Sequence, residues 1–197
     1  LSVDTGLLAG KSRGAEGFQV KFDVRPAEYA LVCDGLYAEG DGDFFSFSGT
    51  LTTDIPVTER TARDMVTVSL ASSSGGAGGK RLAVEWNRTE NDAAASKEHT
   101  FTVRHITRTD ADRYLSVAWT GNAIGSKQGG NKSWLVPPKG DFRVLEIAAD
   151  DPSCIRVRFS LKVDPSQDLR GFVRTGSAVN IRYGIDSNIV SVYNNDG

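Results

Sequence analysis

The sequence predicts an all-β protein, built as tandem antiparallel β-sandwich modules with one short helix near residues 57–65. Glycine, which favours turns, accounts for 21 of the 197 residues, and proline for only 6. Short segments alternate apolar and polar side chains, which is typical of half-buried strands. Helical stripes of Leu and Ala are missing, and no β-α-β alternation is seen, so a parallel sheet is not expected.

The strand segments follow one another along the chain with polar turns between them. Phe18, Val20, Phe22 and Val24 give the first clear alternation, which Pro26 ends because proline cannot donate to a ladder. The predicted strands cover 18–24, 29–33 (ended by the turn residues Asp34-Gly35), 44–53 (with a possible bulge at Gly49), 66–70, 82–86, 99–105, 115–119, 134–136, 142–147, 155–159, 171–174, 179–183 and 189–193. Side chains of His99, Phe101, Val103 and His105 are expected on one face of their strand.

A short helix is predicted over residues 59–65, after a segment at 54–58 that resembles a helix start with a proline near the first turn. Residues 72–79 and 91–96 consist of small and polar residues and are predicted loops. A change of module is expected near Pro137–Gly140. The chain then divides into a lead strand or tail of a preceding module (1–25), a β-sandwich domain (26–139) and a second, incomplete module of about five strands (140–197).

Composition excludes several classes of protein. The formal net charge is −2, which implies no general attraction to nucleic acid or anionic lipid, and 39% hydrophobic residues are too many for a disordered chain. No apolar run reaches the length of a membrane helix, and no signal peptide opens the sequence. Because the chain begins at Leu1 and its single Met is Met65, we expect a processed or excised piece of a longer protein.

The residues that could carry catalysis are few. His99 and His105 would lie about 20 Å apart on a straight strand and could not share a metal ion. Cys33 and Cys154 could pair, but unpaired thiols in different modules are the simpler interpretation, and neither has the context of a nucleophile. We therefore predict no catalytic, cofactor-binding or metal-binding residues, and no enzyme activity.

Three further patterns have both a structural and a functional interpretation. The carboxylates Glu39, Asp41 and Asp43 could hold Ca²⁺, but no closing Glu follows, so a solvated turn is favoured. The same applies to Asp164, Asp168 and Asp186. The segments 87–89 and 131–133 match the N-glycosylation pattern. Trp86, Trp119 and Trp134 could stack on sugars, but Trp86 and Trp119 occupy alternating core-like positions, so burial is favoured over stacking.

Several segments together resemble the bacterial alpha-2-macroglobulin family. The matching stretches are Phe47–Pro56 with Asp64-Met65, Leu82–Trp86 with His99–Val103, Leu115–Trp119 with Gly121 and Ala123–Gly125, Gly140–Leu145, and Val157–Ser160 with Asp164–Gly171, Ile181–Tyr183, Ile185-Asp186, Asn188 and Val192-Tyr193. The run Asp-Pro-Ser-Gln-Asp-Leu-Arg-Gly at 164–171 is the most specific. Together they cover roughly residues 27–197.

The resemblance implies a series of macroglobulin (MG) domains, each a seven-stranded β-sandwich, in a large extracytoplasmic protein that traps proteases. Such proteins are often lipid-anchored on the periplasmic side, and many carry a thioester. The thioester motif Cys-x-Glu-Gln is absent, because Cys33 precedes Asp-Gly and Cys154 precedes Ile-Arg. The implied partners are neighbouring MG domains and, through the parent chain, host or foreign proteases. No cofactor is implied.

Three hypotheses about function follow from the sequence. The first is a non-catalytic MG-domain fragment of a protease-trapping inhibitor. The second is a surface β-sandwich module that binds carbohydrate or a protein partner through its aromatic residues. The third is a hydrolase, which would require a His and a Cys or an acid in one cleft.

Overall fold

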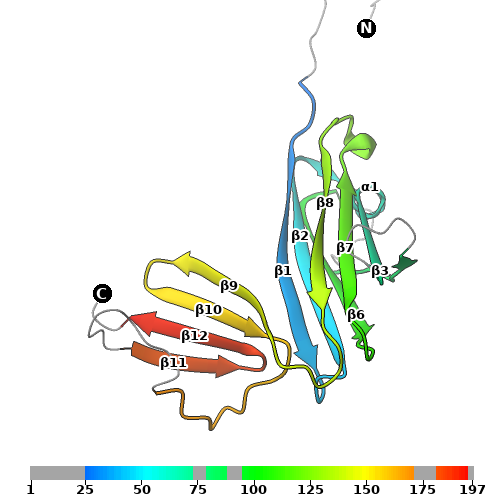
Figure 1. Ribbon diagram of the computed structural model, residues 1–197. Coiled ribbons are helices and arrows are strands. Elements are labelled where there is room, and N and C mark those ends of the chain that lie inside the picture. The colour runs from blue at the N-terminus through cyan, green and yellow to red at the C-terminus, as the bar shows by residue number, and fades with distance from the viewer. Residues whose placement is uncertain (1–24, 73–78, 88–94, 171–180, 195–197) are drawn as a thin grey trace, which may run out of the picture.

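The structure is a computed structural model that describes residues 25–72, 79–87, 95–170 and 181–194 (Figure 1). In these residues twelve strands form three antiparallel sheets, accompanied by one α-helix and one 3₁₀ turn, η2 (Asn122–Ile124). The predicted all-β class is confirmed. The predicted strands at 18–24 and 171–174 lie outside the described residues, as do most of the two predicted loops.

Two sheets form a sandwich from the first part of the chain, and a third sheet forms from the rest (Figure 1). The first sheet has the order β1 (Tyr29–Glu39), β2 (Phe44–Val57), β6 (Ser96–Thr107), β5 (Glu85–Trp86). The second has the order β4 (Lys80–Arg81), β3 (Val66–Ala71), β7 (Arg113–Thr120), β8 (Gly129–Val136). The third, here called the C-terminal sheet, has the order β11 (Ile181–Asp186), β12 (Ile189–Asn194), β10 (Cys154–Phe159), β9 (Val144–Asp151).

The core of the sandwich lies between its two sheets. Alternation along β2 buries Phe45, Phe47 and Leu51 completely, and β7 contributes Leu115 and Val117 from the opposite sheet. The predicted bulge lies on the partner strand instead: the β1–β2 register shifts between Cys33 and Gly35, not at Gly49. Gly49 is required for another reason, since a Cβ there would lie 2.8 Å from the Phe101 ring.

Helix α1 (Glu59–Met65) matches the predicted helix. Its N-cap is Thr58, whose Oγ1 accepts a hydrogen bond from the Thr61 backbone N–H at 3.3 Å. Ala62 and Met65 are buried against the sandwich core. The interpretation of Pro56 as part of the helix start was wrong, because β2 extends through Val57 and the helix begins only after it.

The single strand predicted for 82–86 is in fact a crossing between the two sheets. Lys80 and Arg81 pair with β3, whereas Glu85 and Trp86 pair with β6 in the opposite sheet. The residues between them are half-buried or exposed, with Leu82 and Val84 packed against the core. The apolar alternation at 82–86 therefore comes from a segment that crosses between the edges of the two sheets, and not from one continuous strand.

A bulge in β6 corrects the prediction that His105 shares a face with His99. The register between β2 and β6 shifts between Phe45 and Phe47, and His105 adopts a left-handed φ of 54°. As a result His105 is exposed, and Ile106 takes the buried position in its place. Period-two alternation fails at a bulge because one extra residue reverses the sides of all that follow.

We predict that His105→Gly is more stable than His105→Ala by about 1 kcal/mol, because only glycine adopts a left-handed φ without steric cost. Both variants lose the same contacts of the imidazole with Phe44 and Glu39, so their difference isolates the backbone term. Urea unfolding of the two variants measures it. Equal midpoints would show that the bulge relaxes.

Candidate functional site: the junction between the sandwich and the C-terminal sheet

The most elaborate polar structure in the protein lies where the sandwich meets the C-terminal sheet. The linker from β8 to β9, the β1–β2 hairpin and the end of β10 converge on Arg108, which directly follows β6. The Arg108 side chain is only 1% exposed, which makes it the largest fully buried side chain described. A buried arginine needs a hydrogen-bond acceptor for each donor.

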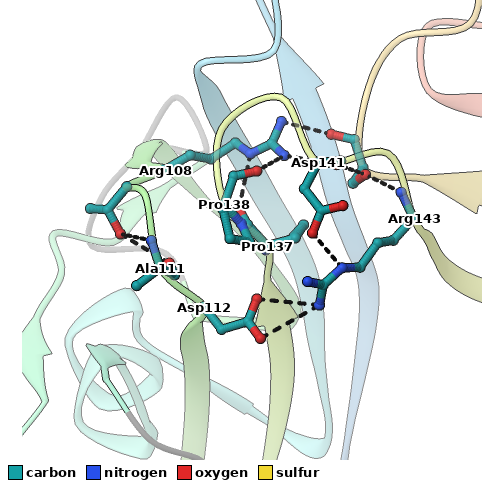
Figure 2. A network of polar contacts seen from close by, with 9 residues as sticks. Arg108, Ala111, Asp112, Pro137, Pro138, Asp141 and Arg143 are labelled. Carbon is teal, nitrogen blue, oxygen red and sulfur yellow. Dashed lines mark hydrogen bonds and ion pairs between the residues drawn. The ribbon is translucent and has the colours of Figure 1, made fainter.

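Arg108 uses its five N–H groups on five backbone carbonyls. Figure 2 shows its side chain beside Pro137 and Pro138 of the linker. Nε donates to Pro137 at 3.1 Å, and Nη2 donates to Pro138 and, at 3.3 Å, to Asp141, all three in the linker. Nη1 donates to Gly42 of the β1–β2 hairpin at 2.7 Å and to Ser160 after β10 at 2.9 Å. One side chain therefore ties together three separate segments.

The electrostatic setting of Arg108 has two parts. Burial lowers the pKa of its guanidinium, while the nearby carboxylates of Asp141 and Asp43 work in the opposite direction. The guanidinium carbon also lies 5.0 Å from the centre of the Phe45 ring. Carbonyl dipoles and an aromatic face thus replace the water that the cation has lost.

The linker is held a second time around Ser160, which is completely buried. The Ser160 hydroxyl donates to the carbonyl of Asp141 at 2.6 Å and accepts from the backbone N–H of Arg143 at 2.7 Å. The Arg143 side chain pairs with Asp141 and Asp112 (Figure 2), and its hydrogen bond to Asp141, more than any other contact, raises its pKa. We name Arg108, Ser160 and linker residues 137–143 the Arg108 cluster.

A second contact joins the C-terminal sheet to β1. From β10, Arg158 donates to the carbonyls of Leu36, at 3.2 Å, and Asp34, and its Nε lies 3.3 Å from Glu146 Oε2. Its guanidinium stacks over the Tyr37 ring at 4.3 Å. The side chain is 7% exposed although its sequence position alternates with apolar residues.

Asn188, in the turn between β11 and β12, completes this second contact. Its Oδ1 accepts from the backbone N–H of Ala38 at 3.1 Å, and its Nδ2 donates to the carbonyls of Leu36 at 3.3 Å and Phe159 at 2.6 Å. The side-chain amide is fully buried and pairs with β1 much as a peptide group of a neighbouring strand would. We name Arg158, Asn188 and their acceptors and donors on β1 the Arg158–Asn188 contact.

Gly35 shapes the surface of β1 that receives this contact. It follows the bulge, has a φ of +86°, and a Cβ there would lie 3.1 Å from Glu146 Oε2 and 3.2 Å from Arg158 Nε. The prediction that Asp34-Gly35 ends the strand was wrong, since β1 continues to Glu39. A glycine that resembled a turn signal is there for close approach of another sheet.

The structure places the two histidines in unrelated surroundings. His99 is buried beside Trp86, and its Nε2 lies 3.1 Å from the carbonyls of both Val57 and Ser96, so that nitrogen carries the proton. The exposed His105 contacts Glu39 through Nδ1 at 3.4 Å. Within the described ranges, no group of three or more His, Cys, Asp or Glu could hold a metal ion.

Both cysteines are free and half-buried. Burial raises the pKa of Cys33 to about 11; Lys132 counteracts this shift and Asp34 adds to it. A thiol with so high a pKa is protonated at neutral pH, which is opposite to the requirement for a nucleophile. Cys154 lies at the start of β10, where its backbone pairs with Tyr193 and Asp151.

The acidic groups serve local contacts instead of meeting. Glu39 contacts His105, and Asp43 pairs with Lys139 at 3.2 Å. Asp164 accepts two hydrogen bonds from Ser166, which lower its pKa, and Asp168 pairs with Arg170. Of the two glycosylation-pattern residues, Asn87 donates to Thr100 Oγ1 at 2.7 Å, and Asn131 is an exposed residue of β8.

The tryptophans are only partly where the sequence predicted them. Trp86 is buried, as expected, whereas Trp119 and Trp134 are half-buried. Trp134 packs edge-on against Phe47 with ring centres 4.8 Å apart, and Lys132 Nζ lies 5.0 Å from its ring centre. Trp134 also lines a recess of about 240 Å³ beside Leu145 of the C-terminal sheet.

Sequence reasoning missed the junction residues as a site. Arg108 lies in a polar stretch that reads as a turn, and Arg158 alternates with apolar residues and so reads as solvent-facing. The sequence feature that could have pointed to them is the Pro-Pro linker. Such a linker must leave some backbone carbonyls without regular hydrogen-bond partners, and a buried arginine can supply the donors.

No protein-family model matches this chain, and neither the curated proteins nor the solved structures contain a significant match. None of the described helices has the length and apolarity that crossing a membrane requires.

We predict that Arg108→Met lowers the free energy of unfolding by about 3–5 kcal/mol, because five buried carbonyls lose their donors while the apolar stem is kept. Arg104→Met is the matched control: Arg104 lies in β6, four residues before Arg108, and its ion pair with Glu85 is exposed, so about 1 kcal/mol or less is expected. Chemical denaturation measures both. Similar losses in the two variants would contradict the assignment of Arg108 as the central residue.

We further predict that Cys33 reacts slowly with iodoacetamide. In a Cys154→Ser background the folded protein should react about 100-fold more slowly than an ordinary thiol at pH 8, since a pKa near 11 instead of 9.0 leaves that much less thiolate. The rate should keep rising with pH up to about 11. The same protein in urea is the control. A plateau near pH 9 in the folded state would refute the shift.

Proposed function

We propose that this chain is a non-catalytic structural segment, made of macroglobulin-like domains, of a bacterial alpha-2-macroglobulin-like protease-trapping inhibitor. One observation carries the proposal. Three motifs of the sequence resemblance, at 140–145, 157–160 and 185–188, meet at the junction. The carbonyl of Asp141, the hydroxyl of Ser160 and the amide of Asn188 all form hydrogen bonds there. Motifs far apart in the sequence thus share one structural task, the fixing of one β unit on the next.

In this proposal, other parts of the parent chain trap the protease. The segment carries no thioester motif, and among the described residues every buried side-chain nitrogen or oxygen has a hydrogen-bond partner. Its proposed partners are neighbouring MG domains of the same parent and, through that parent, host or foreign proteases. The proposed location is extracytoplasmic, in the periplasm or cell envelope.

Protease trapping is tested on the parent chain that contains this sequence. A broad-specificity endopeptidase incubated with the parent should keep its activity on a small peptide substrate but lose its activity on a protein substrate. Equal inhibition of both, or none of either, would overturn the proposal. So would a parent sequence with no further MG module, bait region or thioester region after this segment.

The alternative, a surface module that binds carbohydrate, receives less support. The half-buried Trp134 borders a recess, but Lys132 covers its ring, so a sugar would have to displace a cation before stacking on it. Glycan-array binding that is lost on Trp134→Ala would favour this alternative.

The outer face of the C-terminal sheet supports the proposed contact with neighbouring domains. Alternation directs Arg156 and Arg158 of β10 to the sandwich side and Ile155, Val157 and Phe159 to the other. A recess of about 450 Å³ on that outer face is lined mainly by apolar side chains: Phe142, Val157, Phe159, Val163, Leu169, Val190 and Val192. Ile147 is 68% exposed, which is unusual for so large an apolar side chain.

We predict that the isolated chain binds the hydrophobic dye ANS through this face, and that Ile147→Lys reduces the fluorescence several-fold because it places a charge among the apolar side chains. Val32→Lys is the matched control, since Val32 is 61% exposed but lies on the sandwich. Fluorescence titration measures both variants. An equal reduction by both would show that the dye does not report the outer face.

A further inference from the structure

The two junction contacts differ in how water reaches them. The side chains at the centre of the Arg108 cluster are enclosed, since Arg108 is 1% and Ser160 0% exposed. In the Arg158–Asn188 contact Asn188 is also fully buried, but Arg158 has a recess on either side. Recesses of about 170 Å³ and 240 Å³ both include Arg158 and Glu146 in their walls, one with β1 and the other with β8.

This difference decides which contact opens at the lower cost in free energy. Breaking the Arg108 cluster would leave buried carbonyls of the linker without donors until the whole region unfolds. Separating Arg158 and Asn188 from β1 admits water from the two adjoining recesses, and water can then serve the carbonyls of Asp34 and Leu36. Glu146, the partner of Arg158, already has a side chain that is 40% exposed.

The chain topology permits the one contact to open while the other holds. No strand of the C-terminal sheet pairs with a strand of the sandwich in the described part of the chain. The linker joins the sheet to the sandwich (Figure 1). The sheet is also held by the Arg108 cluster at one end of β10, by the side chains that reach β1, and by Leu145, which packs against the sandwich core. Its own strand ladders do not depend on β1.

We propose that the junction is a hinge: the Arg158–Asn188 contact separates from β1 while the Arg108 cluster stays intact, so that the C-terminal sheet rotates as a unit about the end that this cluster holds. The closed arrangement is the one described above. The inference concerns this chain alone and does not depend on protease trapping. Its consequence is that the angle between two successive β units is set by a contact that can be released.

Distances between spin labels test the hinge. Labels at Glu98→Cys in β6 and Gln167→Cys beyond β10 occupy exposed positions in the two units, in a Cys33→Ser, Cys154→Ser background. We expect one narrow distance distribution for this protein. Asn188→Ala and Arg158→Met should each raise a second, displaced population roughly tenfold or more, because each removes at least two buried hydrogen bonds. Arg104→Met should leave the distribution unchanged.

Hydrogen exchange on the same variants separates a hinge from local unfolding. Amides of β10 and β12 should keep their protection in Asn188→Ala and Arg158→Met, since these strands pair with one another and not with β1. Loss of that protection, an unchanged distance distribution, or an already broad distribution without any substitution would each overturn the hinge. Failure of the parent to trap proteases would leave it untouched.

Discussion

The buried guanidinium of Arg108 is the interaction on which the arrangement of the whole chain depends. A cation that is 1% exposed must be fully solvated by the protein, and here the solvating atoms are backbone carbonyls of the β1–β2 hairpin, the linker and the end of β10. Backbone acceptors fix the course of the chain itself, whereas a carboxylate partner would fix only a side chain. The desolvation cost is therefore offset by bonds that fix the point at which the chain of the C-terminal sheet leaves the sandwich.

Strand β1 forms hydrogen bonds with both the sandwich and the C-terminal sheet unit. Along its whole length it is an edge strand of the sandwich, paired to β2. After the bulge at Asp34, its carbonyls at Leu36 and its N–H at Ala38 are directed to Arg158 and Asn188 of the other unit. A strand edge exposes unpaired backbone groups that invite association. Here that edge is used within the chain, by side chains in place of a further strand, which gives attachment without merging the two sheets into one.

The sequence was sufficient for the parts of the fold that follow local rules. The all-β class and helix 59–65, with Thr58 before it, follow from alternation and capping. Prediction from the sequence failed where tertiary contacts override the alternation of apolar and polar residues. His105 leaves its expected face because of a bulge, residues 82–84 change sheets, and Gly35 accommodates another sheet instead of ending a strand. The roles of Arg108 and Arg158 were not predictable, because only the folded chain brings their carbonyl acceptors together.

The two faces of the C-terminal sheet show how orientation is obtained with little shared apolar packing beyond that of Leu145 against the sandwich core. The face toward β1 carries Arg156, Arg158 and Glu146 together with Ile189, whereas Val157, Phe159, Val190 and Val192 lie on the other. Apolar contact is non-directional and tolerates sliding, whereas hydrogen bonds to named carbonyls require one register. Placing polar groups at the junction and leaving the apolar face outward thus gives one defined angle between the units in the closed state. The same choice makes that angle adjustable, because water can replace those polar partners.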